Sequence, residues 1–131
     1  NYNNKNKLYY NLVLDLNNGI EKPQEDVLKV SKSLKDVLVN NKLSEILMQA
    51  AAIPYEVNGR IQGFQLWEIE DNSVFKVACF NNGDIITAIN GTPLNDASIA
   101  IKILLSLKNA NEAIISYISG GKEKNLKIMI Q

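Results

Sequence analysis

The sequence contains no histidine, and its only cysteine is Cys79. Without histidine, a Ser-His-Asp triad, a Cys-His dyad, a histidine-based zinc motif and imidazole acid–base catalysis are all excluded. One cysteine cannot close an intrachain disulfide or build a thiolate metal cluster. Cys79 lies in the apolar run of residues 77–80, so we expect it to be a buried, unreactive core residue. The sequence therefore predicts neither a metal site nor a cofactor.

An excess of charge of one sign is also missing, because 14 basic residues balance 14 acidic residues. Arg60 is the only arginine among the basic residues. Bidentate recognition of phosphates and base edges depends mainly on arginine. Both observations argue against nucleic acid as a partner.

No apolar run approaches the roughly 20 residues that a membrane-spanning helix needs, and no signal peptide is visible. The chain begins with Asn1 rather than Met. We therefore expect a fragment or a processed form, with any membrane anchor or targeting signal upstream of Asn1. Apolar residues nevertheless make up 46% of the 131 residues, which is enough to build the core of one domain with an appended element.

Residues 1–22 form the first segment that we distinguish, and we expect it to contain one strand and a linker. Apolar side chains alternate strictly along it, which is the period of a half-buried strand; they are Leu8, Tyr10, Leu12, Leu14 and Leu16. Because a single strand is not stable alone, its apolar face must pack on the rest of the chain, on a partner or on a domain absent from this sequence.

Residues 23–52 follow an amphipathic helical pattern. Pro23 with Glu25 and Asp26 is typical of a helix start, and the apolar positions recur at helical spacing; they are Val27, Val30, Leu34, Val37 and Leu38. A second, shorter helix follows and ends before Pro54. Two interpretations of the apolar stripe stay open, namely packing on the following domain and a face for a partner or for a homodimer.

Residues 53–131 have the pattern of a small α+β domain. Strands are expected over residues 53–57, 61–69, 85–89, 113–118 and 126–130, with an apolar helical turn near residues 74–80. Asn95 or Asp96 caps a helix that runs to about Leu107. Asn58-Gly59 and Gly120-Gly121 have the composition of hairpin turns.

The most informative motif lies in residues 80–94. Gly83 suits a turn position that needs a positive φ, and Asn90-Gly91 is a strong turn dipeptide. Ile85, Ile86 and Ile89 form a run that fits a buried strand between these turns. We expect the carboxylate of Asp84 to accept hydrogen bonds from backbone N–H groups.

This segment resembles the "GD-I-I-x-x-I-N-G" core of bacterial PDZ-like domains. Such a domain is a partly open β-barrel or sandwich with a groove helix, here preceded by a helical segment and one N-terminal strand. Over residues 27–131 the chain more narrowly resembles the C-terminal part of GspC, the inner-membrane component of type II secretion systems. The matching blocks are the helix after Val30, the Ile53-Pro54-Tyr55 strand, residues 58–64, Ser73-Val74-Phe75, residues 82–91 and the helix after Asp96.

Two positions depart from the pattern of that family. Ala78-Cys79-Phe80 stands where the family usually has "L-G-L", and the loss of this glycine suggests an altered backbone near the turn. Arg60 replaces a frequent lysine, which is a mild change. Residues 1–22 are similar to the end of the preceding β-rich region of the family, so docking to the outer-membrane secretin is not assigned to them.

The resemblance implies a binding site rather than an active site, because PDZ-like domains do no chemistry of their own. A protein segment would add as a strand beside the strand that starts near Gly63 and would face a helix on the other side. The predicted groove residues are Gln62, Gly63, Phe64, Gln65, Leu66, Ala100, Ile103 and Leu104. Core packing is the alternative for Phe64 and Leu66, and Trp67 is expected on the other sheet face.

The function implied by the resemblance is that of a periplasmic protein-interaction module, part of an inner-membrane protein of a type II secretion apparatus. Its partners would be apparatus components or exported proteins. The alternative is a PDZ module of a periplasmic serine or site-2 protease whose catalytic part lies outside this sequence. The helical lead-in favours the first interpretation.

Overall fold

A computed structural model describes residues 20–24, 26–40, 48–99, 102 and 109–130. The elements in chain order are β1 (Ile20–Gln24), β2 (Val27–Val30), α2 (Lys32–Asn40), β3 (Ala51–Val57), β4 (Arg60–Trp67), α4 (Val74–Val77), β5 (Ile85–Ile89), β6 (Thr92–Pro93), β7 (Glu112–Ser119) and β8 (Lys122–Ile130). The strand expected over residues 8–16 lies outside the described residues, as does most of the second predicted helix.

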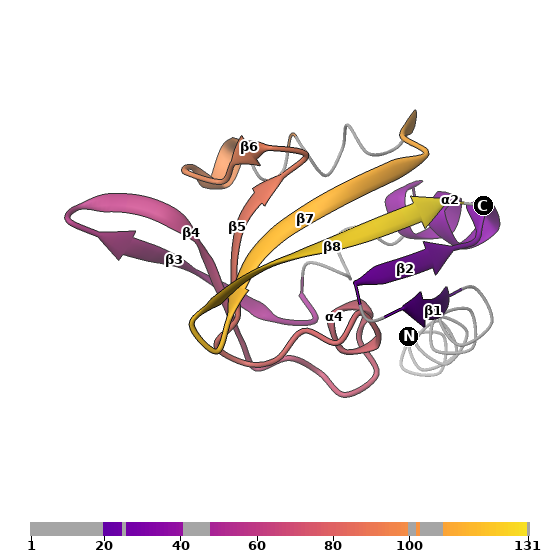
Figure 1. The fold of residues 1–131 in the computed structure, drawn as a ribbon, viewed down its shortest axis with the longest axis horizontal. Coiled ribbons are helices and arrows are strands. Elements are labelled where there is room, and N and C mark those ends of the chain that lie inside the picture. Colours follow the sequence, from indigo (N-terminus) through magenta and orange to yellow (C-terminus); the bar gives the residue numbers. More distant parts are fainter. Residues whose placement is uncertain (1–19, 25, 41–47, 100–101, 103–108, 131) are drawn as a thin grey trace, which may run out of the picture.

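The strands form one twisted sheet with the order β1-β2-β8-β7-β5-β4-β3, and β6 pairs with β5 beside this path. Figure 1 shows the β3–β4 hairpin at one end of the sheet and β1, β2 and α2 at the other. The expected turns are present. The φ angles are 54° at Asn58 and 77° at Gly59, and 51° at Asn90 and 79° at Gly91. These left-handed pairs are what a two-residue hairpin turn requires.

The helical interpretation of Val27 and Val30 is wrong. Residues 27–30 form β2, which pairs in parallel with β8 through Val27–Lys127 to Val30–Ile130. A spacing of three favours a helix, because in a strand it puts the two side chains on opposite faces. The pairing with a strand about a hundred residues later nevertheless makes this segment a strand. The helix begins only at Lys32, where the Oγ of Ser31 accepts a hydrogen bond from the N–H of Leu34 at 3.1 Å.

The N-terminal elements share the main core with the rest of the domain. Leu28 of β2 and Leu34 of α2 are almost fully buried. They belong to one apolar cluster, whose other members are Val30, Leu66, Ala78, Phe80 and Leu126. A second, smaller cluster contains Phe64, Ile89 and Leu94. Residues 27–34 therefore pack on the domain that follows them.

The expectation that Cys79 is buried is wrong, because its side chain is exposed. Helix α4 ends at Ala78, and Cys79 then adopts a φ of 66°. This left-handed residue turns the chain, so that Ala78 and Phe80 point into the core and Cys79 does not. Cys79 occupies the position where the GspC pattern has glycine. It keeps the left-handed conformation that glycine favours, and this conformation is strained for a residue with a side chain.

Exposure of Cys79 makes its thiol available to reagents in the native protein. A thiol-specific probe such as dithionitrobenzoate is expected to label one equivalent of the folded chain, since Cys79 is exposed. Labelling rates in buffer and in denaturant should be of the same order. If the Cys79 thiol reacted slowly in buffer and rapidly only in urea, the side chain would be buried and the exposed placement would be wrong.

Candidate functional site

The turn before β5 is built around a buried carboxylate. Asp84 is only 3% exposed. Its Oδ2 accepts a hydrogen bond from the N–H of Asn81 at 2.9 Å, and its Oδ1 accepts one from the hydroxyl of Ser119 at 2.6 Å. Gly83 has a φ of +94°, as expected. Asp84 is therefore a structural acceptor that ties the turn to the end of β7.

Strand β4 is hydrogen-bonded on both sides in its second half. It pairs antiparallel with β3 from Ala51–Trp67 to Val57–Arg60, and with β5 at Phe64–Ile86 and Gln65–Ile85. Leu66 also donates to the carbonyl of Asp84 at 2.8 Å and accepts from the N–H of Gly83 at 2.7 Å. The backbone of residues 64–66 thus has no free side, which differs from the expectation that a bound segment lies beside Gly63.

Strand β3 is one of the two edge strands of the sheet, β1 being the other, and among the described residues it pairs with β4 alone. Because the backbone groups of Leu66 face β5, its partner Ala52 is in a non-hydrogen-bonded pair of the β3–β4 ladder. The N–H and C=O of Ala52 therefore face the open edge, as does the C=O of Pro54 two residues later. Proline is tolerated at this position because the N–H that it lacks would face the open edge and would not take part in the β3–β4 ladder.

The two faces of β3 differ in their environment. Ala52 and Pro54 lie opposite Leu66 and Phe64, on the face that holds the core. Ile53, Tyr55 and Val57 point to the other face and are 51%, 37% and 42% exposed. An extended segment at the open edge would therefore meet apolar side chains on both faces of β3.

The structure places the five predicted strand residues in three environments. Phe64 and Leu66 are buried in the two core clusters. Gly63 and Gln65 are on the opposite face, where Gln65 Nε2 donates to the carbonyl of Gly83 at 3.2 Å. Gln62 is exposed and lines a pocket. The strand over residues 53–57 was predicted and is present as β3, but the sequence reasoning did not identify it as an edge strand, although Pro54 within a strand is a signal of an edge.

The helix expected opposite the strand is described only at its start. Residues 97–99 and Lys102 are helical, and Asp96 is the cap: its Oδ1 accepts from the N–H and the hydroxyl of Ser98 at 2.8 and 2.9 Å. The backbone N–H of Ser98, followed by its hydroxyl, lowers the pKa of the exposed Asp96 carboxyl below its usual value. Ala100, Ile103 and Leu104 lie outside the described residues, so their place in a groove wall stays a prediction.

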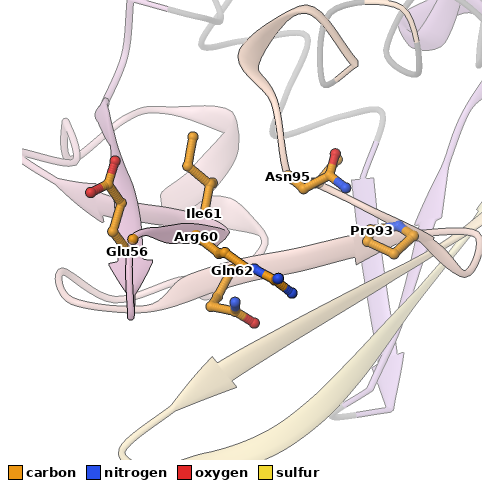
Figure 2. Close-up of a pocket in the computed structure, with 8 residues that line it drawn as sticks. Glu56, Arg60, Ile61, Gln62, Pro93 and Asn95 are labelled. Carbon is orange, nitrogen blue, oxygen red and sulfur yellow. The ribbon is translucent and has the colours of Figure 1, made fainter.

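A pocket of about 560 Å³ opens beside the tip of the β3–β4 hairpin. It forms beside the first half of β4, before the pairing of β4 with β5 begins at Phe64, and β6 pairs with Ala88 and Ile89 of β5 on its other side. Figure 2 shows the hairpin on one side of this pocket and Pro93 and Asn95 on the other. The lining residues are Glu56, Gly59, Arg60, Ile61, Gln62, Pro93, Leu94 and Asn95.

The described residues contain no group of three or more Cys, Asp or Glu side chains that would hold a metal ion. Nor does any helix among them have the length and hydropathy needed to cross a bilayer. The features that the structure does present are therefore an open strand edge, an exposed apolar strand face and a pocket next to them.

A scan against protein-family models finds no match, and a search of curated proteins finds none either. Solved structures do match. The PDZ domain of EpsC from Vibrio cholerae has a TM-score of 0.56 at 18% identity, over 74% of this chain and 91% of that one. The PDZ domain of the pullulanase C protein of the Klebsiella pneumoniae type II secretion system, solved in complex with a fatty acid, has a TM-score of 0.51 at 20% identity, over 69% and 90%. The likeness establishes that this chain has the PDZ-like fold that its sequence predicts.

Proposed function

We propose that this chain is a protein-interaction module of a type II secretion apparatus and that it binds an extended protein segment along the open edge of β3. The observation that carries the proposal is the unpaired backbone of Ala52 and Pro54 at that edge. A segment that adds there as a strand satisfies these groups and gains main-chain hydrogen bonds. No catalytic step is proposed for the described residues.

Two observations support secretion as the context. The structures of EpsC and pullulanase C share the fold of this chain, and the second belongs to a type II secretion system. The sequence also resembles GspC in the helix after Val30 and in the Ile53-Pro54-Tyr55 strand. We therefore propose a periplasmic location, within an inner-membrane protein, and partners that are apparatus components or exported proteins. A PDZ module of a periplasmic protease is the alternative, and a protease signature in adjacent sequence would favour it.

Replacement of Ala52 by proline tests the binding mode. The substitution removes an N–H that faces the open edge and leaves every β3–β4 hydrogen bond in place, so the fold should persist. The probe is a displayed library of random decapeptides, from which the best binder is synthesised. Its affinity for Ala52→Pro should be about two- to twelvefold weaker, the effect of one lost main-chain hydrogen bond of about 0.5–1.5 kcal/mol.

Ala52→Ser is the matched control, because it changes the same exposed side chain and keeps the N–H. Circular dichroism checks that both variants are folded. Equal affinities of a folded Ala52→Pro and of the wild type would exclude strand addition at β3. A library that yields no binder would remove the evidence for a peptide-binding function altogether.

A further inference from the structure

The exposed apolar side chains of the described residues gather on one face of the β3–β4 hairpin. Six large apolar side chains are exposed among these residues. Four of them lie on this face, which we call the outer apolar face: Ile53, Tyr55 and Val57 of β3 and Trp67 of β4. Trp67 shares the face because it lies directly opposite Ala51, from which the three β3 residues follow at alternate positions. Single exposed apolar residues are normal, but a contiguous set indicates an interaction surface.

On the β4 side, the cross-strand neighbours of Ile53 and Tyr55 are not apolar. Ile53 lies opposite Gln65, and Tyr55 lies opposite Gly63, which has no side chain. The side-chain amide of Gln65 donates to the carbonyl of Gly83, in the turn that leads into β5 on the other side of β4. The free cross-strand positions beside Ile53 and Tyr55 are therefore on the open side of β3.

The hydrogen-bonding pattern of the open edge fixes which residues of an added strand reach these positions. Because the backbone groups of Ala52 face that edge, a residue opposite Ala52 in an antiparallel added strand forms a hydrogen-bonded pair with it. The residues opposite Ile53 and Tyr55 are then in non-hydrogen-bonded pairs, in which the side chains are closest. These two residues are separated by one, so both side chains point to the outer apolar face.

The chemistry of this face favours apolar partners. From Ala51 to Tyr55 of β3, and at the opposite positions 63, 65 and 67 of β4, the side chains on this face carry no charge. Aromatic and β-branched side chains are the favoured cross-strand partners of one another. A bound apolar side chain at either position would also remove the exposed surface of Ile53 or Tyr55 from water, which adds a favourable hydrophobic contribution.

We propose that the outer apolar face selects the partner: the protein segment that adds to β3 carries two aromatic or β-branched residues, separated by one, which pack on Ile53 and Tyr55. The inference rests on the proposed function, since it assigns side-chain preferences to a segment bound at that edge. The residue between the two lies opposite Pro54 and points to the other face of the sheet, so the outer apolar face does not select it.

The test compares the peptides that the wild-type chain, Ile53→Lys and Tyr55→Lys select from a displayed library of random decapeptides. Wild-type binders should be enriched in aromatic or β-branched residues at two positions separated by one. Ile53→Lys should change the preference at one of them to Asp or Glu, and Tyr55→Lys should do so at the other. Ile114→Lys is the matched control, because Ile114 is also exposed but lies on β7, with β5 and β4 between it and β3, and it should leave the selection unchanged.

The size of the effect is measured with the best wild-type peptide and a copy in which the residue opposite Ile53 is alanine. The wild-type chain should bind the alanine copy about two- to fivefold more weakly, as expected for the loss of one cross-strand pair. Ile53→Ala should bind the peptide and its copy equally, and this comparison also serves if a lysine variant does not fold by circular dichroism.

The outcomes separate this inference from the proposed function. Unchanged selection in both folded lysine variants, or the same affinity ratio in Ile53→Ala and the wild type, would overturn the inference while strand addition at β3 stands. If Ile53→Lys converted a dimer into a monomer and left the selection unchanged, the outer apolar face would contact a second copy and the inference would be wrong. Absence of any binder from the library would overturn both.

Discussion

Replacing Gly63 by alanine is expected to destabilise the domain by about 3 kcal/mol, although Gly63 does not have a positive φ. A Cβ at this position would collide with the backbone carbonyl oxygen of Ile86 and would lie 3.1 Å from the Cγ2 of Ile85. The colliding atom belongs to the backbone of β5, so a side-chain rotation cannot relieve it. The strands must separate at the point where β4 and β5 pair.

The measurement is equilibrium unfolding in urea, followed by circular dichroism. Gln62→Ala is the control, because it changes the preceding residue of the same strand, whose side chain is exposed. Gln62→Ala should leave the midpoint nearly unchanged, whereas Gly63→Ala should lower it strongly. If Gly63→Ala were as stable as Gln62→Ala, the backbones of β4 and β5 would have to lie farther apart in solution than they do in this structure.

The role of Gly63 shows how far the sequence leads. Glycine in a strand is typical of a site where a ligand or another backbone approaches closely, and the sequence resemblance favoured a ligand at Gly63. The sequence did not identify the approaching backbone, because the neighbour at Ile86 is part of the fold and not a bound segment. Glycine within a strand indicates crowding, and only the pairing of the strands shows what crowds it.

Local chemistry made the turns and most strands predictable. Asn58-Gly59, Gly83 and Asn90-Gly91 have the positive φ angles that their residue types favour, and β5, β7 and β8 lie where the apolar runs predict them. The PDZ-like architecture follows from this order of elements. The resemblance to GspC proteins of type II secretion systems is confirmed in fold by EpsC and pullulanase C.

The errors arose where a distant contact overrides a local pattern. Val27 and Val30 form a strand because β8 lies beside them. Cys79 is exposed because a left-handed residue turns the chain after α4. Alternation also cannot show which strand of a hairpin is outermost, and only the pairing of β4 with β5 leaves β3 at the edge where we propose binding.

Leu34→Ala is expected to lower the free energy of unfolding of the whole domain by about 2–5 kcal/mol. Leu34 is 3% exposed and packs in the same cluster as Leu66 and Leu126, which belong to β4 and β8. The adjacent Lys35 also donates a hydrogen bond from its Nζ to the carbonyl of Ala110, which fixes α2 to the segment before β7. A loss of this size is a large part of the 5–15 kcal/mol that typically stabilises a domain.

Fluorescence of Trp67, the only tryptophan, gives the test its specificity. Trp67 lies on β4 near Gly83 and therefore reports on the PDZ-like part of the chain. If α2 shares the main core, Leu34→Ala shifts the urea transition of Trp67, whereas Ser33→Ala, at an exposed position of the same helix, does not. An unshifted Trp67 transition in Leu34→Ala would mean that the helix folds as a separate unit, and that its apolar face is free to bind a partner or a second copy of the chain.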